Sequence, residues 1–322
     1  GETLKKVRKD IVISSKVGFV NFKGEQNFSP EYIRNSLESS LKRLQTDYID
    51  IFQLHDPQIN ILQEDHRIFE TLESLKQEGK IRIIGISTKS PEESLIAIEQ
   101  FYVKGIQVNF NLIDQRALDN GLFKKCEELG VGIIGRTPLC FGFLTGKYSA
   151  DDNYVTSDHR SLWSREQLDC WAKAYKLFSE EFTGLKEQTN TQIALRYCLS
   201  YPMLSTTIPG MLTEEHVDEN TSSSNYGIFS DSQLQKFRNI TWPLILGVLF
   251  VLLLGLSALG LIVLYSASNQ NNIMVIKQAT RVGVAFILML ILCQIPPRYY
   301  RKWSPWFFGI GILLLVAVLI VG

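Results

Sequence analysis

The chain has 322 residues and a formal net charge of zero, with 33 basic and 33 acidic residues. The absence of a basic excess excludes binding to nucleic acid through a strongly basic surface, so we expect no nucleic-acid partner. The balance is an average of two unlike parts. Residues 239–322 contain five basic residues and no acidic one, so residues 1–238 carry 28 basic and 33 acidic residues, a net charge of −5. A mildly acidic stretch is typical of a cytosolic domain, and an acid-free apolar stretch is typical of a membrane segment.

The first residues, GETLKKVRKDIVISSK, lack the long apolar core of a signal peptide, and they begin with Gly instead of Met. We interpret this beginning as a processed or truncated end. Five cysteines are scattered along the chain, with no CxxC pair and no histidine at ligand spacing. We therefore predict free thiols in a reducing compartment, and no metal site. The cysteines are Cys126, Cys140, Cys170, Cys198 and Cys293.

Six short apolar runs recur in the first 238 residues. They are DIVISSKV, YIDIFQLH, IRIIGIST, IQVNFNL, GVGIIGRTP and MLSTTIPG. Each is apolar on both alternations, which predicts strands that are buried on both faces, as in a parallel sheet.

Helical patterns lie between these runs. Ser29 is a candidate N-cap, followed by Pro30 and Glu31, which suit the first helical turn. The apolar positions at helical spacing are Ile33, Leu37, Leu41 and Leu44, then Leu72 and Leu75, then Leu95, Ile98 and Phe101, and finally Leu122, Phe123 and Leu129. We expect the last three helices to end at Gly79, Gly105 and Gly130. Strands alternating with helices predict a parallel sheet with crossover helices. A closed (β/α)8 barrel needs eight strands, so six strands indicate either an incomplete barrel or a different doubly wound sheet.

Polar groups stand where five successive predicted strands end. They are Lys16, His55, Ser87, Gln107 and Arg136. Because the carboxyl ends of parallel strands face the active site in α/β folds, these residues are candidates for catalysis and binding. A solvated lysine and a satisfied histidine at a strand end remain the alternatives for the first two.

Several longer stretches resemble the aldo-keto reductase family. They are DIVISSK, SLKRLQTDYIDIFQLHDP, LESLKQEGKIRIIGIS, IQVNFNLIDQR, GFLTGKY and TTIPGMLTEEHVDEN. The resemblance covers about residues 1–237 and implies a (β/α)8 barrel that reduces aldehydes and ketones with a nicotinamide dinucleotide. The family usually uses NADPH and binds it without a Rossmann fold, and no GxGxxG motif follows a strand here.

The resemblance also implies roles for single residues. Lys16 and His55 match two members of the family's catalytic Asp–Tyr–Lys–His set. Ser87 and Gln107 match the groups that hold the nicotinamide carboxamide, and Arg136 stands where many members place an aromatic ring. The other implied cofactor contacts are Thr88, Thr137, Pro138, Leu139, Ile208, Pro209, Gly210, Glu219 and Asn220. Leu212 lies in a stretch where several members carry a basic residue for the 2′-phosphate, so we expect NADP(H) but NAD(H) stays open.

The family's catalytic Asp and Tyr lie upstream of the matched region and have no counterpart here. Asp47 and Tyr48 belong to the usual approach to the strand that carries His55, so we interpret them as structural. Loss of the general acid costs about 10²–10⁴ in rate. We therefore expect an oxidoreductase with impaired activity toward small carbonyl substrates.

The last 84 residues predict three transmembrane helices, at residues 242–265, 274–297 and 306–322. Residues 239–276 contain no charged residue, and the 24 residues of the first span can cross about 30 Å of hydrocarbon. The basic loop RYYRK at residues 298–302 predicts a cytoplasmic connection between the second and third spans. We therefore expect the barrel part in the cytoplasm, on a bacterial inner membrane.

The stretches WPLILGVLF, GLIVLYSAS and QIPPRYYRKWSPW are similar to the beginning of the RodA/FtsW (SEDS) family. This family polymerises peptidoglycan from lipid II and acts in cell shape and cell division. The similarity covers about 80 residues, and no acidic residue follows Asp231 that could serve as the family's catalytic acid.

Three hypotheses follow for a chain whose two parts meet at about residue 238. The first is a membrane-anchored aldo-keto reductase domain, 1–238, followed by a three-span membrane segment, 239–322. The second is a peptidoglycan glycosyltransferase fragment with a cytosolic appendage, whose membrane segment contacts partners in cell-wall synthesis as well as the lipid bilayer. The third is a chimeric gene model that joins parts of two proteins.

Overall fold

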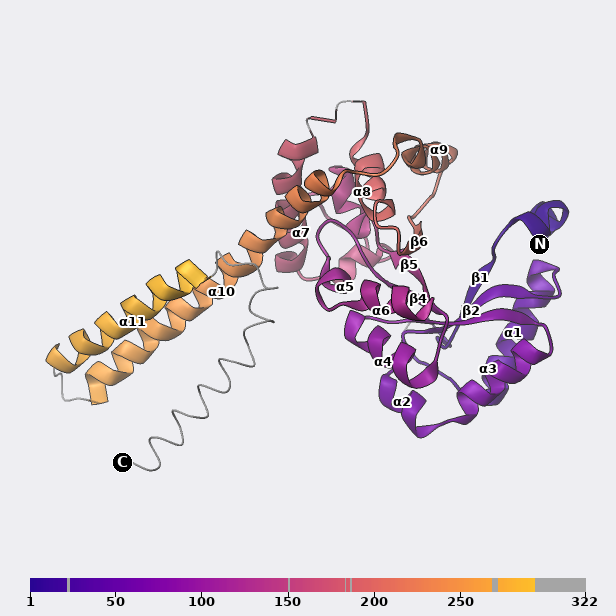
Figure 1. Ribbon diagram of the computed structural model, residues 1–322, viewed down its shortest axis with the longest axis horizontal. Helices are drawn as coiled ribbons and strands as arrows, with labels where there is room; N and C mark the ends of the chain where they lie inside the picture. Colours follow the sequence, from indigo (N-terminus) through magenta and orange to yellow (C-terminus); the bar gives the residue numbers. More distant parts are fainter. Residues whose placement is uncertain (22–23, 150, 183, 186, 268–271, 293–322) are drawn as a thin grey trace. The chain divides into compact units, whose positions relative to one another are not determined.

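The computed structural model describes residues 1–21, 24–149, 151–182, 184–185, 187–267 and 272–292. The chain divides into two compact units, Gly1–Thr241 and Trp242–Gly322. The first unit contains a parallel sheet covered by helices, and the second contains helical segments (Figure 1).

The sheet has six strands in the order β1-β2-β3-β4-β5-β6, and every neighbouring pair is parallel. The strands are β1 (Ser14–Val17), β2 (Ile49–His55), β3 (Ile81–Ser87), β4 (Gly105–Asn109), β5 (Gly132–Arg136) and β6 (Leu204–Ile208). Each strand lies beside the next one along the chain. This order has no point of reversal, so it is the winding of a barrel and not that of a doubly wound sheet. Among the described residues, β1 and β6 each pair on one side only.

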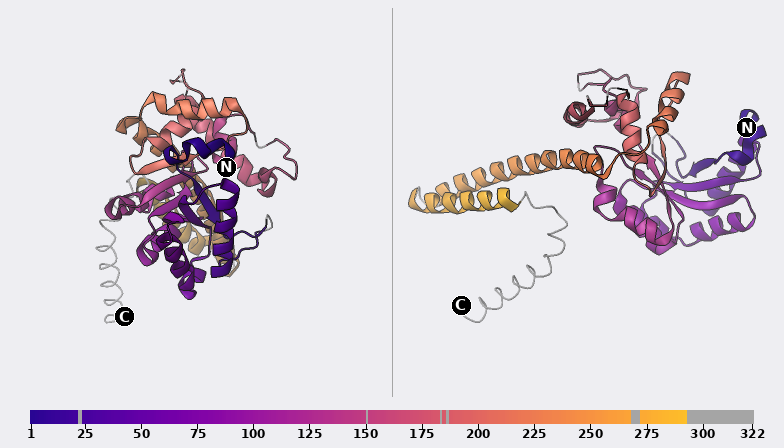
Figure 2. Two further views of the ribbon diagram at one scale, coloured as in Figure 1. Left: turned by 90° about the vertical axis from the view of Figure 1, so that its right-hand side faces the viewer. Right: turned by 45° about the horizontal axis from the view of Figure 1, so that its top comes forward.

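Helices follow each of these strands. Those of the first unit are α1 (Pro30–Leu44), α2 (Ile59–Glu64), α3 (Arg67–Gln77), α4 (Pro91–Phe101), α5 (Arg116–Asp119), α6 (Leu122–Leu129), α7 (Arg165–Phe182), α8 (Asn190–Leu199) and α9 (Glu214–Ser222). Short 3₁₀ helices cover Glu2–Asp10, Cys140–Thr145, His159–Leu162 and Ser223–Tyr226. The helices α1, α3, α4, α6 and α8 contact the strands, and the two further views show this helical layer (Figure 2).

The first helix forms as its sequence predicts. Ser29 Oγ accepts a hydrogen bond from the backbone N–H of Tyr32 at 3.3 Å, and Pro30 is the first helical residue. The helix ends at Gln45, which is left-handed with φ 52°. Its buried side chains include Ile33 and Leu37, which confirms the predicted apolar face.

One predicted helix end and one predicted apolar position differ from the structure. The helix α4 ends at Tyr102, which has a left-handed backbone with φ 53°, and Gly105 instead begins β4. The helix α6 does end at Gly130, but Leu129 is 42% exposed and lies off the buried face. The sequence patterns also missed α7, α8 and α9, of which α8 packs against β6.

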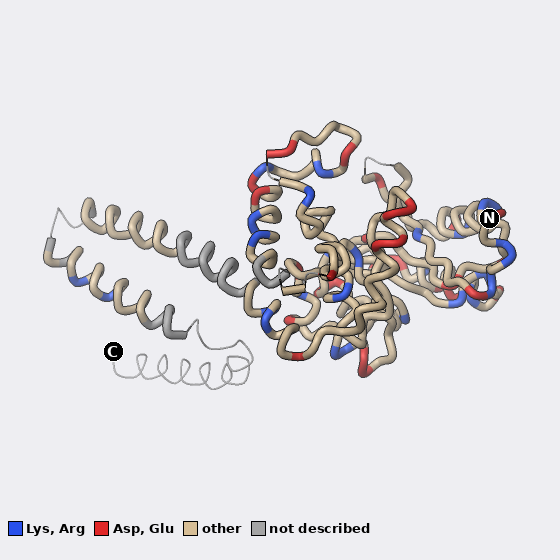
Figure 3. Tube along the Cα trace, turned by 90° about the horizontal axis from the view of Figure 1, so that it is seen from above, with Lys and Arg blue, Asp and Glu red and all other residues tan. Residues whose placement is uncertain are grey.

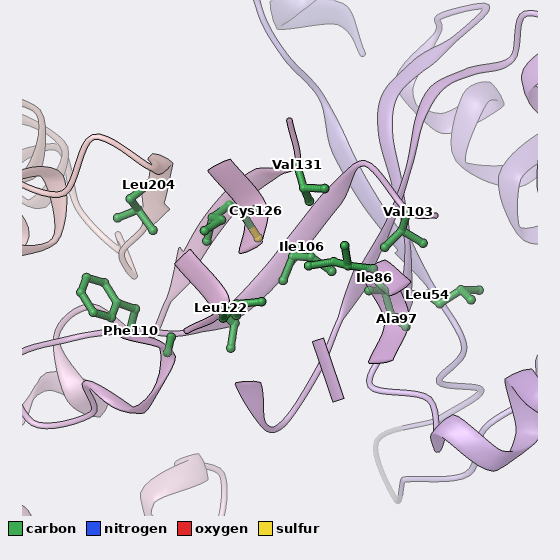
Figure 4. Close-up of a cluster of buried hydrophobic side chains, with 14 of the residues drawn as sticks. Leu54, Ile86, Ala97, Val103, Ile106, Phe110, Leu122, Cys126, Val131 and Leu204 are labelled. Carbon is green, nitrogen blue, oxygen red and sulfur yellow. The ribbon is translucent and has the colours of Figure 1, made fainter. Parts of the chain in front are cut away.

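The core lies between the strands and the helices (Figure 4). Leu54, Ile86 and Ile106 come from three neighbouring strands, and each is fully buried. Leu122 and Cys126 of α6 face them from the helical layer. The thiols of Cys126, Cys140 and Cys198 are free and buried and that of Cys170 is free and exposed, while Cys293 lies outside the described residues.

The face of the strands opposite the helices becomes polar toward their carboxyl ends. Successive side chains of a strand point to opposite faces, so Phe52 and Leu54 of β2 share one face, and Ile51 and Gln53 share the other. The register places Lys16 beside Gln53, His55 beside Ser87, and Ser87 beside Gln107. The sheet therefore gathers polar groups on one face, toward the carboxyl ends of its strands.

Helices occur where the first two transmembrane segments were predicted. They are α10 (Asp231–Ala267) and α11 (Asn272–Leu292). Figure 3 shows that α11 carries basic but no acidic residues. In the part of the chain that the structure describes, no helix combines the length and the apolar character needed to cross a bilayer. The third predicted span and the basic loop at 298–302 lie outside the described residues.

Candidate active site

A cavity of about 830 Å³ opens at the carboxyl ends of the strands. Lys16 of β1, Gln107 of β4 and Arg136 of β5 line it, together with Ile208 at the end of β6. Its other walls come from the segment after β5 and from α9. The polar ends of at least three strands therefore meet at one cavity, which is the usual place of an active site in such folds.

Lys16 is held through Gln107. Its ammonium Nζ donates to Gln107 Oε1 at 3.4 Å, and Gln53 Nε2 donates to the same oxygen at 3.2 Å. Burial lowers the pKa of Lys16, the nearby charge of Arg136 lowers it further, and Asp56 opposes both. The Lys16 ammonium is thus a stronger acid than that of an ordinary lysine and releases its proton more readily.

Gln53 supports this arrangement, although the sequence patterns did not single it out. Its Nε2 also donates to Ser14 Oγ at 2.7 Å, and its Oε1 is buried without a hydrogen-bond partner in the described part of the chain. A Cβ at Gly85 would lie 3.0 Å from Gln53 Cγ, so the glycine makes room for this side chain. A polar amide between Phe52 and Leu54 in the run YIDIFQLH was the signal that could have identified it.

His55 stands at the end of β2. Its ring contacts Phe19 edge to face, with ring centroids 4.6 Å apart, and its backbone oxygen accepts from Gln26 Nε2 at 3.0 Å. Burial lowers the pKa of His55, and the positive charges of Lys16 and Arg136 act in the same direction, against the carboxylate of Asp56. The imidazole is therefore neutral at pH 7.

This lowered pKa predicts a pH dependence of stability. The unfolded chain binds a proton at His55 more tightly than the folded chain does. The free energy of unfolding is therefore unaffected by the protonation of this residue above its ordinary pKa of 6.5 and falls as the pH drops below that value. His55→Gln is expected to flatten the decline in the urea midpoint between about pH 7 and 5. The exposed His66 provides the control, because His66→Gln is expected to leave the slope unchanged. An unchanged slope in His55→Gln would contradict the assignment.

A charge network joins four strand ends beside His55. Arg136 Nη1 donates to both oxygens of Asp56, at 3.0 and 3.1 Å, and Ser87 Oγ donates to Asp56 Oδ1 at 2.9 Å. Arg136 Nε donates to Asn109 Oδ1 at 2.7 Å. Asp56 was not singled out from the sequence. Its place directly after His55 was the available signal.

The site residues predicted from the sequence divide into two groups by their place relative to the cavity. Those that line the cavity are Thr137, Pro138, Leu139, Ile208, Gly210, Glu219 and Asn220. His55, Ser87, Thr88 and Pro209 are not among its lining residues. The hydroxyl of Thr88 is fully buried and bonds to Ser90 O at 3.0 Å and Ser94 Oγ at 2.6 Å, so it supports the start of α4.

The cavity also has a charged and aromatic wall that the sequence patterns missed. The Arg160 guanidinium lies 3.8 Å from the ring centroid of Tyr148 and pairs with Asp158 at 2.7 Å. This pairing lowers the pKa of Asp158 to about 2. Lys147 and His216 line the cavity as well. The basic groups on this wall suit the phosphates of a ligand.

Asp47 and Tyr48 lie outside this cavity. The guanidinium groups of Arg8 and Arg82 each lie 3.9 Å from the Tyr48 ring centroid. These cation–π contacts give Tyr48 a structural role.

Comparison with known proteins assigns the two parts of the chain to different families. Residues 1–241 match the family model described as "Aldo/keto reductase family". Residues 245–322 match the model for FtsW, RodA and SpoVE, described as "Cell cycle protein".

Individual relatives agree with the first match. The chain is 28% identical to L-galactose dehydrogenase of Arabidopsis thaliana over 254 residues, which are 73% of this chain and 74% of that protein. It is 30% identical to L-glyceraldehyde 3-phosphate reductase of Escherichia coli K12 over 244 residues, 70% of this chain and 68% of that protein. The holo structure of aldo-keto reductase AKR11C1 from Bacillus halodurans superposes with a TM-score of 0.61 and 26% identity, covering 74% of this chain and 76% of that one. The chain therefore belongs to the aldo-keto reductase family, and residues 245–322 form a segment of the FtsW/RodA/SpoVE type.

Proposed function

We propose that the Gly1–Thr241 unit reduces aldehydes or ketones with a nicotinamide dinucleotide, NADP(H) or NAD(H), bound in the cavity at the strand ends. The observation that carries the proposal is that Lys16, Gln107 and Arg136 come from three strands to line one cavity. Membership of the aldo-keto reductase family supports it. One relative, the aldo-keto reductase yakc of Schizosaccharomyces pombe, has NADP(+) in its name, which favours NADP(H).

The residues around the cavity fit such a cofactor. A volume of about 830 Å³ lies within the range of cofactor pockets, ~300–1,000 Å³. Gln107 uses its Oε1 for Lys16 and Gln53, so its Nε2 can donate to the carboxamide of a nicotinamide. Arg160 and Lys147 offer cations to phosphates. When bound, the dinucleotide supplies the hydride.

The other contacts follow from their places in the cavity. Residues 137–139 and 208–210 offer backbone groups to the phosphates of the cofactor. Glu219 and Asn220 of α9 would hold its adenine, and Asn220 Nδ2 already donates to Gly210 O at 3.4 Å. Ser87 and Thr88 are fully buried and act behind the cavity wall, through Arg136 and α4.

Lys16 and His55 are the candidate groups for moving the proton. The Lys16 cation stabilises negative charge on a carbonyl oxygen in the cavity, and its lowered pKa favours release of the proton. We propose that turnover through these groups alone is slow, by about 10²–10⁴ relative to a site with a tyrosine acid. The hydrogen bond of Lys16 to an amide oxygen, where the family places a phenol and a carboxylate, supports this part of the proposal.

Titration of the full chain with NADPH, followed by its fluorescence, tests this function. We expect saturable binding, which Gln107→Leu weakens about tenfold because a hydrogen-bonding amide is lost. Gln63→Leu removes an exposed amide that bonds Gln100 far from the cavity, and we expect it to bind like the wild type. Binding that is absent, or equal in both variants, would overturn the proposal. Loss of NADPH absorbance with small aldehydes and ketones then measures turnover.

For residues 242–322 we propose an anchor in the bacterial inner membrane, with the first unit on the cytoplasmic side. The uncharged stretch 239–276 and the match to the FtsW/RodA/SpoVE model support it. The same match favours a second candidate function, participation of this segment in cell-wall synthesis with partners in the membrane. The full chain is expected to stay with bacterial membranes after alkaline carbonate extraction, since integral proteins resist it. Release into the supernatant would exclude the anchor.

A further inference from the structure

Asp56 has an unusual backbone conformation, and both its backbone N–H and its backbone carbonyl make hydrogen bonds. Its φ is +50°, in the left-handed region that few residues other than glycine adopt. Its N–H donates to Ser87 O at 2.9 Å, and its carbonyl accepts from Gln26 Nε2 at 3.1 Å. A residue held in this way by its surroundings, at the cost of backbone strain, is a candidate for a functional role.

The carboxylate of Asp56 is fixed as firmly as its backbone. It accepts two hydrogen bonds from Arg136 Nη1 and one from Ser87 Oγ, and Arg136 Nη1 also donates to Ser87 Oγ at 3.1 Å. The side chains of Asp56 and Arg136 are only 10% and 16% exposed. The pair is thus shielded from water, where charge-assisted hydrogen bonds are strong.

These contacts leave one edge of the guanidinium for another partner. Arg136 uses Nη1 for Asp56 and Ser87 and uses Nε for Asn109. Within the described residues, its Nη2 group makes no hydrogen bond, although arginine has five N–H donors in a fixed plane. Arg136 lines the cavity, so the Nη2 edge is the part that a ligand can reach.

We propose that Asp56 is a positioning residue, which holds Arg136 so that the Nη2 edge donates to an oxygen of a nicotinamide dinucleotide in the cavity. This inference rests on the proposed function. Asp56 itself does not line the cavity, so it acts through Arg136. A guanidinium that is already fixed loses less side-chain entropy when the ligand binds than a mobile one does. The ligand therefore binds more tightly to the fixed guanidinium.

Four forms of the full chain test the proposal by NADPH titration: wild type, Asp56→Asn, Arg136→Met and the double variant. Asparagine tolerates the left-handed backbone and keeps the size of the side chain, so Asp56→Asn removes the charge and little else. We expect Asp56→Asn to raise the Kd about tenfold. The double variant is expected to bind no more weakly than Arg136→Met, because both changes remove the same contact.

Asp114→Asn is the matched control. Asp114 pairs with Arg116 at 2.7 Å, and neither residue lines the cavity, so we expect no change in Kd. The double variant removes both buried charges, which keeps the comparison with Arg136→Met possible even if Asp56→Asn alone folds poorly.

The outcomes separate this inference from the function on which it rests. A wild-type chain that does not bind NADPH overturns both. A wild-type chain that binds, together with an unchanged Kd in Asp56→Asn, overturns the positioning role alone. The positioning role is also overturned if the losses of binding free energy in the two single variants add up in the double variant, because Asp56 and Arg136 would then act independently.

Discussion

Replacing Arg136 with methionine is expected to lower the free energy of unfolding of the first unit by about 3 kcal/mol. The reason is the charge that remains. Asp56 is 10% exposed, and without Arg136 its carboxylate keeps only the hydrogen bond from Ser87. Removing one partner of a buried pair leaves the other uncompensated, which costs more than the pair itself contributes.

Adding Asp56→Asn to Arg136→Met should therefore restore part of the stability, about 1 kcal/mol or more, since it removes the uncompensated charge. Pulse proteolysis of the full chain in urea measures both changes. A double variant that is less stable than Arg136→Met would contradict this, because it would mean that the Asp56 carboxylate has a compensating partner other than Arg136.

The second large effect is expected from Phe110→Ala, which should destabilise the first unit by about 3–5 kcal/mol. Phe110 is fully buried. Its ring centroid lies 4.8 Å from that of Phe123 on α6, 5.8 Å from Tyr197 on α8 and 5.2 Å from Tyr201. Truncation would open a cavity between two helices and the end of β4, which these rings cannot fill.

The control for this prediction is Tyr102→Ala. Tyr102 is 80% exposed, and a surface substitution of this kind changes stability by about 0.5 kcal/mol or less. The same urea experiment serves for both. A loss below about 1 kcal/mol in Phe110→Ala would mean that α6 and α8 do not share one core with the sheet.

The strands could be predicted because their signal is local. Each of the six apolar runs overlaps one strand of the sheet. The predicted polar residues His55, Ser87 and Arg136 end β2, β3 and β5, whereas Lys16 and Gln107 lie one and two residues before the ends of β1 and β4. Parallel strands bring such ends together, so Lys16, Gln107 and Arg136 could be expected at one place before their distances were known.

The network around Asp56 could not be predicted in the same way. Asp56 and Arg136 are 80 residues apart, and no periodic pattern relates them. Their contact depends on the order β2-β3-β4-β5 and on the left-handed backbone of Asp56, which belong to the folded state alone. The polar Gln53 inside an apolar strand was a usable local signal that the patterns left unexplained.

The turns that shape the cavity wall after β5 were hidden for a related reason. Thr137, Cys140 and Phe141 all have positive φ, although none is glycine, so no local preference indicates these turns. Tertiary contacts impose them. Phe141, for example, stacks on Trp171 of α7 with ring centroids 5.0 Å apart.

Hydrogen exchange of the full chain with and without NADP⁺ would locate the cofactor site as well as detect binding. We expect slower exchange at the strand ends and cavity walls, residues 85–88, 105–109, 134–142 and 208–220, and unchanged exchange in α1 and α3. Protection that is absent, or confined to other segments, would contradict the assignment of this cavity to a nicotinamide dinucleotide.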